Sequence, residues 1–223
     1  MQEWWQQLVQ SSPFLRYLMR EQTQRELLER TSQHISLVGT AMLIALLIAL
    51  PVGLLVARWK RGGDTILGIL GILYTIPSLA LLVLLIPVVG LGFKAAIITL
   101  VIYAQLVLVR NVAVGLRSVD PAVIEAARGM GMSAWERLRM VELPIALPII
   151  IAGVRIAALS TIAIATVASL INAGGLGRTL FEGVSQGNKP KVIVGALAVS
   201  LLAIVVDQIL RLMERLAQRR LIG

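Results

Sequence analysis

Five long apolar stretches, each nearly free of charged residues, constrain this chain more than any other feature of its sequence. They run over residues 35–57, 65–87, 95–116, 146–171 and 192–212. A helix that crosses a bilayer needs about 20 mostly apolar residues. Because the chain is also 57% apolar and only 15% charged, the sequence predicts an all-α integral membrane protein with five transmembrane helices. The same pattern excludes a soluble enzyme, a secreted disulfide-stabilised domain and a disordered chain.

Several kinds of chemistry are excluded by residues that the sequence lacks. It has no cysteine and one histidine, His34, which excludes thiolate metal sites, disulfides and histidine clusters. The phosphate-binding pattern G-x-x-x-x-G-K-[ST] does not occur, so we expect neither an ATP site of that kind nor a cofactor in this chain. The net charge is +9, as in many nucleic-acid-binding proteins. Here the basic residues lie between apolar stretches and form no continuous stripe, so we predict membrane lipid as a partner and no nucleic acid.

The distribution of Lys and Arg predicts the orientation of the chain. Basic residues gather after the first stretch, between the third and fourth, and after the fifth: Arg58, Lys60, Arg61, Arg117, Arg128, Arg137, Arg139, Arg211, Arg215, Arg219 and Arg220. Loops that stay in the cytoplasm carry such an excess. With five spans, the C-terminus is therefore expected inside and the N-terminus outside.

Residues 1–34 are predicted to form an extracytoplasmic N-terminal segment, ahead of a transmembrane domain at 35–223. Arginines and glutamates balance within this segment, and a neutral segment can be exported. Ser12 and Pro13 are typical of a helix start. The apolar residues that follow predict a helix lying in the outer interface: Phe14, Leu15, Leu18, Leu27 and Leu28. A disordered tail is the alternative.

Prolines and polar residues within the stretches indicate breaks and a route for a substrate. Three stretches contain a proline, which kinks or breaks a membrane helix: Pro51, Pro77 and Pro148. Hydroxyl groups near these positions either form a mildly polar path between helices or simply assist packing, and both interpretations stay open. The residues assigned to the translocation pathway are Tyr74, Thr75, Ser78 and Asn172.

Charged side chains within the stretches need partners or access to the interface. Arg110 and Asp207 lie near predicted cytoplasmic ends and can extend towards water. Arg155 lies deeper, and a pair between Arg155 and Asp207 is one arrangement that would satisfy both charges.

The predicted cytoplasmic loop at 117–144 is more than a connector. Asp120 and Pro121 are typical of a helix start, and Gly129 and Gly131 end that helix. Ser133 and Glu136 then form the capping box S-x-x-E of a second short helix, which is expected to stop at 143–144. Two capped helices around a glycine turn predict a docking element on the inner membrane face.

Two other interpretations of this loop are rejected. Residues 129–134 match the dinucleotide pattern G-x-G-x-x-A, but that pattern requires a preceding strand, and a helix precedes it here. A DNA-binding helix-turn-helix has similar caps, yet a loop tethered between two spans hardly reaches a major groove.

The loop also resembles a known signature. Its residues are similar to the EAA signature (EAA-x3-G-x9-I-x-LP) of bacterial ABC importer permeases, with valine in place of the usual isoleucine: Glu125, Ala126, Ala127, Gly131, Val141, Leu143 and Pro144. The resemblance extends over about 35–212 and is closest to osmoprotectant permeases for glycine betaine, carnitine and choline. Residues 172–177 are similar to the GAGGLG segment of that family, with Asn172 in place of its first glycine.

The resemblance implies a type I ABC importer permease fold in the bacterial inner membrane. It also implies partners: cytoplasmic ATPase subunits that bind ATP and Mg²⁺ and receive the loop, a second permease subunit, identical or paralogous, and an extracytoplasmic substrate-binding protein. Quaternary ammonium groups are recognised by aromatic cages. Only Tyr74 and Tyr103 lie within the stretches among the aromatic Tyr and Trp residues, so we expect high-affinity selection elsewhere.

The predicted function is therefore a transport subunit, not an enzyme, that moves a quaternary-amine osmoprotectant inward. One alternative keeps the machinery and changes the substrate to an amino acid or another small metabolite. A second alternative is an ion-coupled secondary transporter, although such folds usually show internal repeats and none is evident here. A purely structural membrane protein would give no reason for the capped loop.

Overall fold

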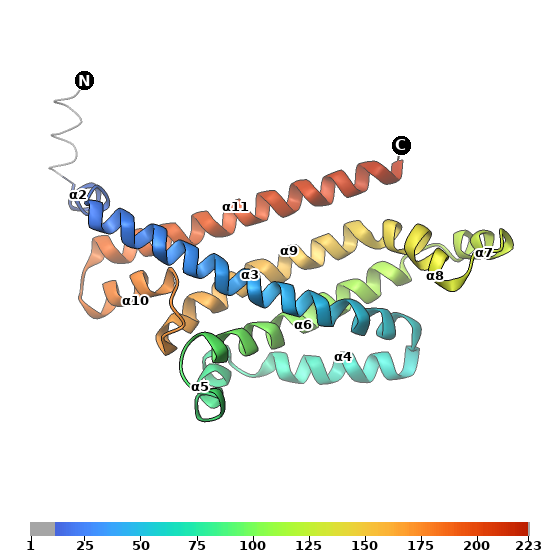
Figure 1. Ribbon diagram of the computed structural model, residues 1–223, viewed down its shortest axis with the longest axis horizontal. Coiled ribbons are helices and arrows are strands. Elements are labelled where there is room, and N and C mark those ends of the chain that lie inside the picture. The colour runs from blue at the N-terminus through green and yellow to red at the C-terminus, as the bar shows by residue number, and fades with distance from the viewer. Residues whose placement is uncertain (1–11, 223) are drawn as a thin grey trace, which may run out of the picture. The chain divides into compact units, whose positions relative to one another are not determined.

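The described part of the chain, residues 12–222 of a computed structural model, is helical almost throughout (Figure 1). The α-helices are α2 (Pro13–Leu18), α3 (Glu21–Arg58), α4 (Lys60–Thr75), α5 (Ser78–Val89), α6 (Phe93–Arg117), α7 (Pro121–Gly129), α8 (Ala134–Arg137), α9 (Leu143–Ala168), α10 (Gly177–Ser185) and α11 (Lys189–Ile222). A π-helical turn, Leu138–Glu142, joins α8 to α9, and a 3-10 turn, Ser169–Ile171, follows α9. The prediction of an all-α protein is confirmed.

Four of the predicted spans correspond to long apolar helices. Within the described residues, four helical segments are long and apolar enough to cross a membrane: 21–58, 93–117, 134–171 and 189–219. The pair formed by α4 and α5 gives a fifth only if the two helices count as one broken span. The number of spans and their orientation therefore stay predictions.

The predicted second span is broken at a proline. Ile76 and Pro77 both have extended backbone, with ψ of 129° and 131°, between α4 and α5. The residue before a proline is driven out of the helical region by the pyrrolidine ring. The chain does not break at the other two prolines, since Pro51 lies inside α3 and Pro148 lies inside α9. The kinks expected at these positions stay a prediction.

The N-terminal helix begins where it was predicted and ends earlier. Ser12 caps α2, since its Oγ accepts from the backbone N–H of Leu15 at 3.4 Å. The expected single helix carrying Leu27 and Leu28 is wrong, because α2 ends at Leu18 and both leucines belong to α3. The helix α3 runs unbroken past residue 34, and the division into 1–34 and 35–223 stays a prediction.

The described residues cluster into two compact units. The first comprises 12–41, 77–100 and 161–204, and the second comprises 42–76, 101–160 and 205–222. Each unit therefore takes one part of α3, α6, α9 and α11. The loop at 117–144 belongs entirely to the second unit.

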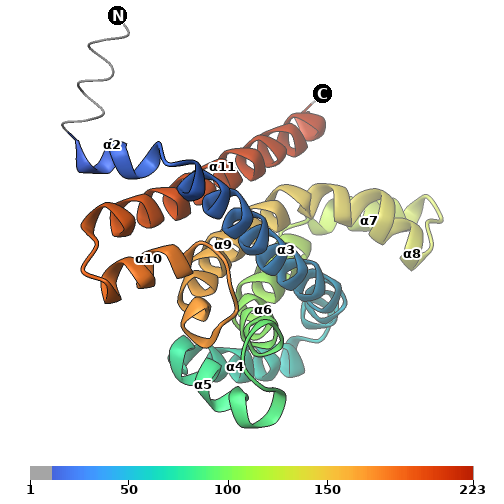
Figure 2. The same ribbon diagram turned by 60° about the vertical axis from the view of Figure 1, so that its left-hand side comes forward.

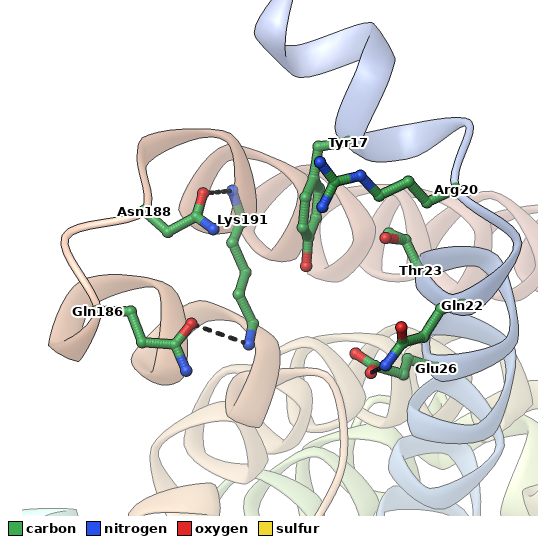
Figure 3. A pocket seen from close by; sticks show the side chains of 8 residues that line it. All are labelled: Tyr17, Arg20, Gln22, Thr23, Glu26, Gln186, Asn188 and Lys191. Carbon is green, nitrogen blue, oxygen red and sulfur yellow. Dashed lines mark hydrogen bonds between the residues drawn. The ribbon is translucent and has the colours of Figure 1, made fainter.

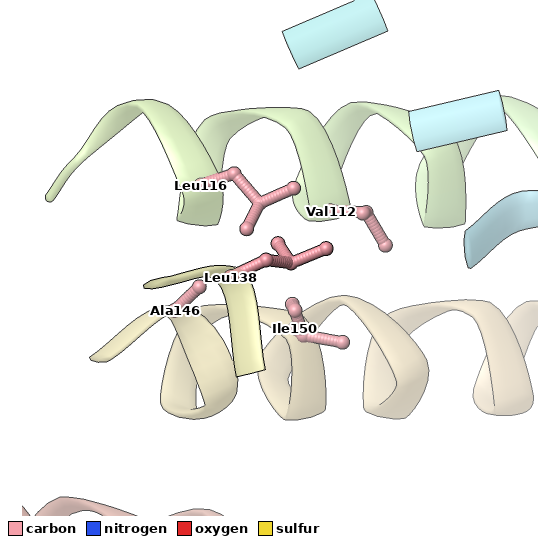
Figure 4. Close-up of a cluster of buried hydrophobic side chains, with 5 residues drawn as sticks. All are labelled: Val112, Leu116, Leu138, Ala146 and Ile150. Atoms are coloured by element: carbon pink, nitrogen blue, oxygen red, sulfur yellow. The ribbon is translucent and has the colours of Figure 1, made fainter. Parts of the chain in front are cut away.

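The second unit has a buried apolar cluster beneath the loop (Figure 4). Its buried members come from α6, the π-helical turn and α9: Val112, Leu116, Leu138, Ala146 and Ile150. Figure 4 shows the Leu138 side chain inserted between α6 and α9. From α3, Leu54 and Ala57 pack against the same cluster. The cluster thus fixes the base of the loop to three helices.

Candidate functional site

The loop at 117–144 starts with a capped helix. The Oδ1 of Asp120 accepts from the backbone N–H of Ala122 at 2.8 Å, and Pro121 occupies the first helical position. Both features were predicted and are confirmed. On α7, the side chain of Ala127 is buried, while Glu125 and Ala126 are exposed. The helix α7 therefore packs against the protein through Ala127, while Glu125 and Ala126 lie on its exposed surface.

Gly131 makes the turn between the two loop helices. Its φ is +82°, a left-handed conformation that side chains other than glycine rarely adopt. A Cβ built on Gly131 has no heavy atom within 4 Å. The turn therefore requires glycine for its backbone, while the space above it stays open.

The second loop helix is capped as predicted but does not stop where expected. The Glu136 carboxylate accepts from the backbone N–H of Ser133 at 2.8 Å, and Ser133 Oγ accepts from the N–H of Glu136 at 3.3 Å. The expected stop at 143–144 is wrong, since α8 passes through the π-helical turn into α9. Pro144 then lies directly after this turn, as the second residue of α9.

The outer surface of the loop carries exposed apolar side chains. Met130 is 75% exposed, and Trp135 and Met140 are each 67% exposed. Val141 and Leu143 are half-buried and Pro144 is exposed. Figures 1 and 2 show α7 and α8 projecting beyond the ends of α6 and α9. A protruding surface with apolar side chains and an open glycine turn suits a protein partner.

Glu142 is a loop residue whose ion pairs were not predicted from the sequence. Its side chain is only 3% exposed. Arg137 Nε donates to its Oε1 at 3.0 Å, and Arg58 Nη2 donates to its Oε2 at 2.6 Å. The only local signal was its place beside Leu143 and Pro144 in the signature, and Arg58 lies 84 residues away in sequence.

The four residues assigned to the pathway fall in both units. In the second unit, the Tyr74 and Tyr103 rings are 5.5 Å apart, and Thr75 Oγ1 donates to the carbonyl of Ile72 at 2.7 Å. Ser78 and Asn172 belong to the first unit. Asn172 has a φ of +62°, a conformation that asparagine tolerates better than most residues. That these residues share one pathway stays a prediction.

An ion cluster in the first unit was also missed. Glu182 accepts from Arg30 Nη2 at 2.9 Å, from Lys191 Nζ at 2.8 Å and from Arg178 Nε at 2.8 Å. Burial raises the pKa of this carboxyl, but the hydrogen bonds from Lys191, Arg178 and Arg30 outweigh it and lower the pKa to about 2. The cluster joins α3, α10 and α11.

A polar pocket of about 190 Å³ lies beside this cluster (Figure 3). Its lining comes from α2, α3 and the turn between them, from the segment after α10 and from the start of α11: Tyr17, Arg20, Gln22, Thr23, Glu26, Gln186, Asn188 and Lys191. In Figure 3, Lys191 is held by Asn188 at its backbone and by Gln186 at its ammonium group. Within the described residues, no group of three or more histidine or acidic side chains could hold a metal ion.

The pairing of Arg155 and Asp207 is present. Arg155 Nη1 lies 3.3 Å from Asp207 Oδ1, and Arg155 Nε lies 3.3 Å from Glu214 Oε2. Arg211 also binds Asp207, at 2.8 Å. These contacts attach α11 to α9 within the second unit.

Comparison with known proteins gives a consistent result. The family described as "Binding-protein-dependent transport system inner membrane component" matches residues 41–219. The choline transport system permease protein OpuBB of Bacillus subtilis is 42% identical over 190 residues, which cover 85% of this chain and 88% of that protein. The osmoprotectant import permease protein OsmW of Salmonella typhimurium is 41% identical over 189 residues, covering 82% and 88%.

Solved structures agree in fold. The methionine ABC transporter MetNI, in an inward-facing conformation, matches with a TM-score of 0.80 and 25% identity, covering 89% of this chain and 99% of that chain. The type I importer permease fold expected from the EAA signature is therefore confirmed. The chain belongs to the family of binding-protein-dependent transport system inner membrane components.

Proposed function

We propose that this chain is the permease subunit of an ATP-driven importer that moves a quaternary-amine osmoprotectant, such as glycine betaine, carnitine or choline, into the cell. The observation that carries the importer assignment is the projecting loop, with its two capped helices, its open glycine turn and its exposed Met130 and Trp135. The substrate class is supported by the names of relatives that are about 40% identical.

The proposed assembly divides the work among several chains. Two cytoplasmic ATPase subunits bind ATP and Mg²⁺, and each receives one loop against its surface. A second permease subunit, identical or paralogous, completes the pathway, and an extracytoplasmic protein delivers the substrate. With the C-terminus inside and five spans, the basic loop at 117–144 faces the ATPase. Tyr74, Thr75, Ser78 and Asn172 then contact the substrate in transit.

A second candidate substrate class is an amino acid. It is favoured by the structural likeness to MetNI, a methionine transporter. The relatives named for choline, carnitine and osmoprotectants share more of the sequence, so the osmoprotectant is preferred.

Uptake by the assembled complex tests the proposal. The chain is produced with an ATPase subunit and a binding protein from the same organism, in membrane vesicles loaded with ATP. Labelled choline, glycine betaine, carnitine and methionine are supplied separately. We expect uptake of at least one quaternary amine, dependent on ATP hydrolysis and insensitive to ionophores. Uptake of methionine alone would favour the second candidate, and uptake abolished by ionophores with ATP present would indicate an ion-coupled transporter.

A further inference from the structure

Both ends of the loop at 117–144 are tied to the last turn of α3. At the first end, Arg117 Nη2 donates to the carbonyl of Val56 at 2.6 Å, and its Nε donates to the carbonyl of Ala57 at 3.4 Å. At the other end, Glu142 binds the side chain of Arg58, the final residue of α3. The terminal carbonyls of a helix have no partner within it, so Arg117 satisfies groups that would otherwise need water.

Glu142 is the buried centre of the second tie. Each of its oxygens accepts from a different arginine: Oε1 from Arg137 of α8, and Oε2 from Arg58 of α3. A buried carboxylate is stable only when it is paired and hydrogen-bonded. Removing either arginine leaves one oxygen of this buried group without its charged partner. The carboxylate therefore holds α8, α3 and the start of α9 in one arrangement.

The surrounding packing makes the same connection. Leu54 and Ala57 of α3 pack on the cluster that contains Leu138 of the π-helical turn. At the same cluster α6 and α9 approach closely, since a Cβ on Gly115 would lie 3.1 Å from the carbonyl oxygen of Ala146. Closely packed side chains have low compressibility and therefore transmit strain from one helix to the next.

We propose that Glu142 is a positioning residue that makes the loop and the end of α3 move as one body, so that displacement of α8 by the ATPase reaches a transmembrane helix. The inference rests on the proposed function and adds a route for the coupling. Glu142 touches neither substrate nor nucleotide in this scheme. Its loss leaves the exposed docking surface intact and breaks the connection behind it.

The test measures transport and ATP hydrolysis in the same preparation of assembled complex. Arg58→Gln is the decisive variant, because Arg58 is 44% exposed and its loss leaves Arg137 paired with Glu142. Glu142→Gln is the stronger variant and also removes the buried charge. We expect Arg58→Gln to retain bound ATPase and to hydrolyse ATP within about twofold of wild type. The amount of substrate moved per ATP hydrolysed should fall by about tenfold. This factor corresponds to the lower end of the free energy that a hydrogen bond to a charged group contributes.

Two further variants separate positioning from folding. Arg58→Lys keeps a cation within reach of Glu142 and should restore much of the transport per ATP hydrolysed that Arg58→Gln loses. Arg61→Gln removes an exposed arginine three residues further along the chain. This variant should move as much substrate per ATP hydrolysed as the wild type. Should Glu142→Gln fail to assemble, Arg58→Gln decides the question by itself.

The results separate this inference from the proposed function. If transport and ATP hydrolysis fall in equal proportion in Arg58→Gln, or if neither changes, the positioning role is wrong while the transporter assignment stands. If the wild-type complex shows no ATP-dependent uptake of any substrate tried, the proposed function fails and the inference fails with it.

Discussion

Arg30 Nη2 of α3 lies 2.9 Å from Glu182 Oε2 of α10, although the two residues are 152 positions apart in sequence. Lys191 of α11 binds the same oxygen at 2.8 Å. One carboxylate therefore joins three helices of the first unit. Ion pairs that are partly buried and shared among several cations contribute more than isolated surface pairs.

The Glu182 cluster should make stability depend on pH. The pKa of Glu182 falls from 4.5 to about 2 on folding, so the folded state favours the charged form. This stability is fully present above pH 4.5 and is lost as the pH falls through about 2. We expect Glu182→Gln to lower the free energy of unfolding by about 2 kcal/mol at pH 7, discounted for partial exposure. The stability difference between this variant and the wild type is measured by thermal unfolding in detergent at pH 7 and pH 3.

A matched control exists on α3. Glu21 pairs with Arg25, but their side chains are 88% and 83% exposed, so Glu21→Gln should change the unfolding midpoint little. The difference in unfolding midpoint between Glu182→Gln and the wild type should be smaller at pH 3 than at pH 7. A gap that is equal at both pH values would show that the Glu182 charge contributes nothing.

Helix packing gives a second prediction. A Cβ on Gly153 of α9 would lie 2.3 Å from the Cβ of Asn111 on α6, too close for two carbon atoms. Gly153→Ala should therefore destabilise the protein by about 1–3 kcal/mol. Gly68→Ala is the control, because Gly68 is also helical and has open space at that point, so alanine should be neutral or stabilising there. Equal unfolding midpoints for the two variants in detergent would contradict the close approach of α6 and α9.

The features that the sequence predicted well are local. Apolar length predicts five spans, of which four are long apolar helices among the described residues. The caps at Asp120 and Ser133 depend on residues within one turn. Such signals need no knowledge of the fold. The end expected at Pro144 failed because a π-helical turn, which no residue pattern announces, carries the chain smoothly into α9.

The contacts that could not be predicted join residues distant in sequence. Glu142 finds Arg58, and Glu182 finds Arg30, only after the helices have packed. A charged residue in a sequence indicates that a partner is needed, but not which one. The pair of Arg155 and Asp207 could be suggested because few charges lie within the spans, which left few alternatives.

Cysteine labelling tests the orientation. Because the chain has no native cysteine, single cysteines give no background. Cysteines at Ser12 and Gln186 should react with an impermeant thiol reagent in intact cells, whereas cysteines at Asp64 and Gln218 should react only after lysis. Asp64 is exposed and is preferred to Gly62, where a Cβ would lie 2.3 Å from the Trp59 ring. Labelling of position 64 in sealed cells would show that the orientation is the reverse of the predicted one. The loop at 117–144 would then lie on the side of the membrane away from the ATPase.

Gly131 and Gly90 allow docking to be separated from backbone strain. Both have positive φ, +82° and +81°, and neither has a heavy atom within 4 Å of a built Cβ. An arginine at either position is strained by about 1–3 kcal/mol, and its Cβ has no heavy atom of the subunit within 4 Å. Only Gly131 lies in the loop, so Gly131→Arg should lose bound ATPase and ATP-driven uptake, while Gly90→Arg should retain the ATPase. Co-purified ATPase is measured at equal amounts of membrane-inserted subunit. Normal retention in Gly131→Arg, or equal loss in both variants, would show that the open turn is not where the ATPase binds.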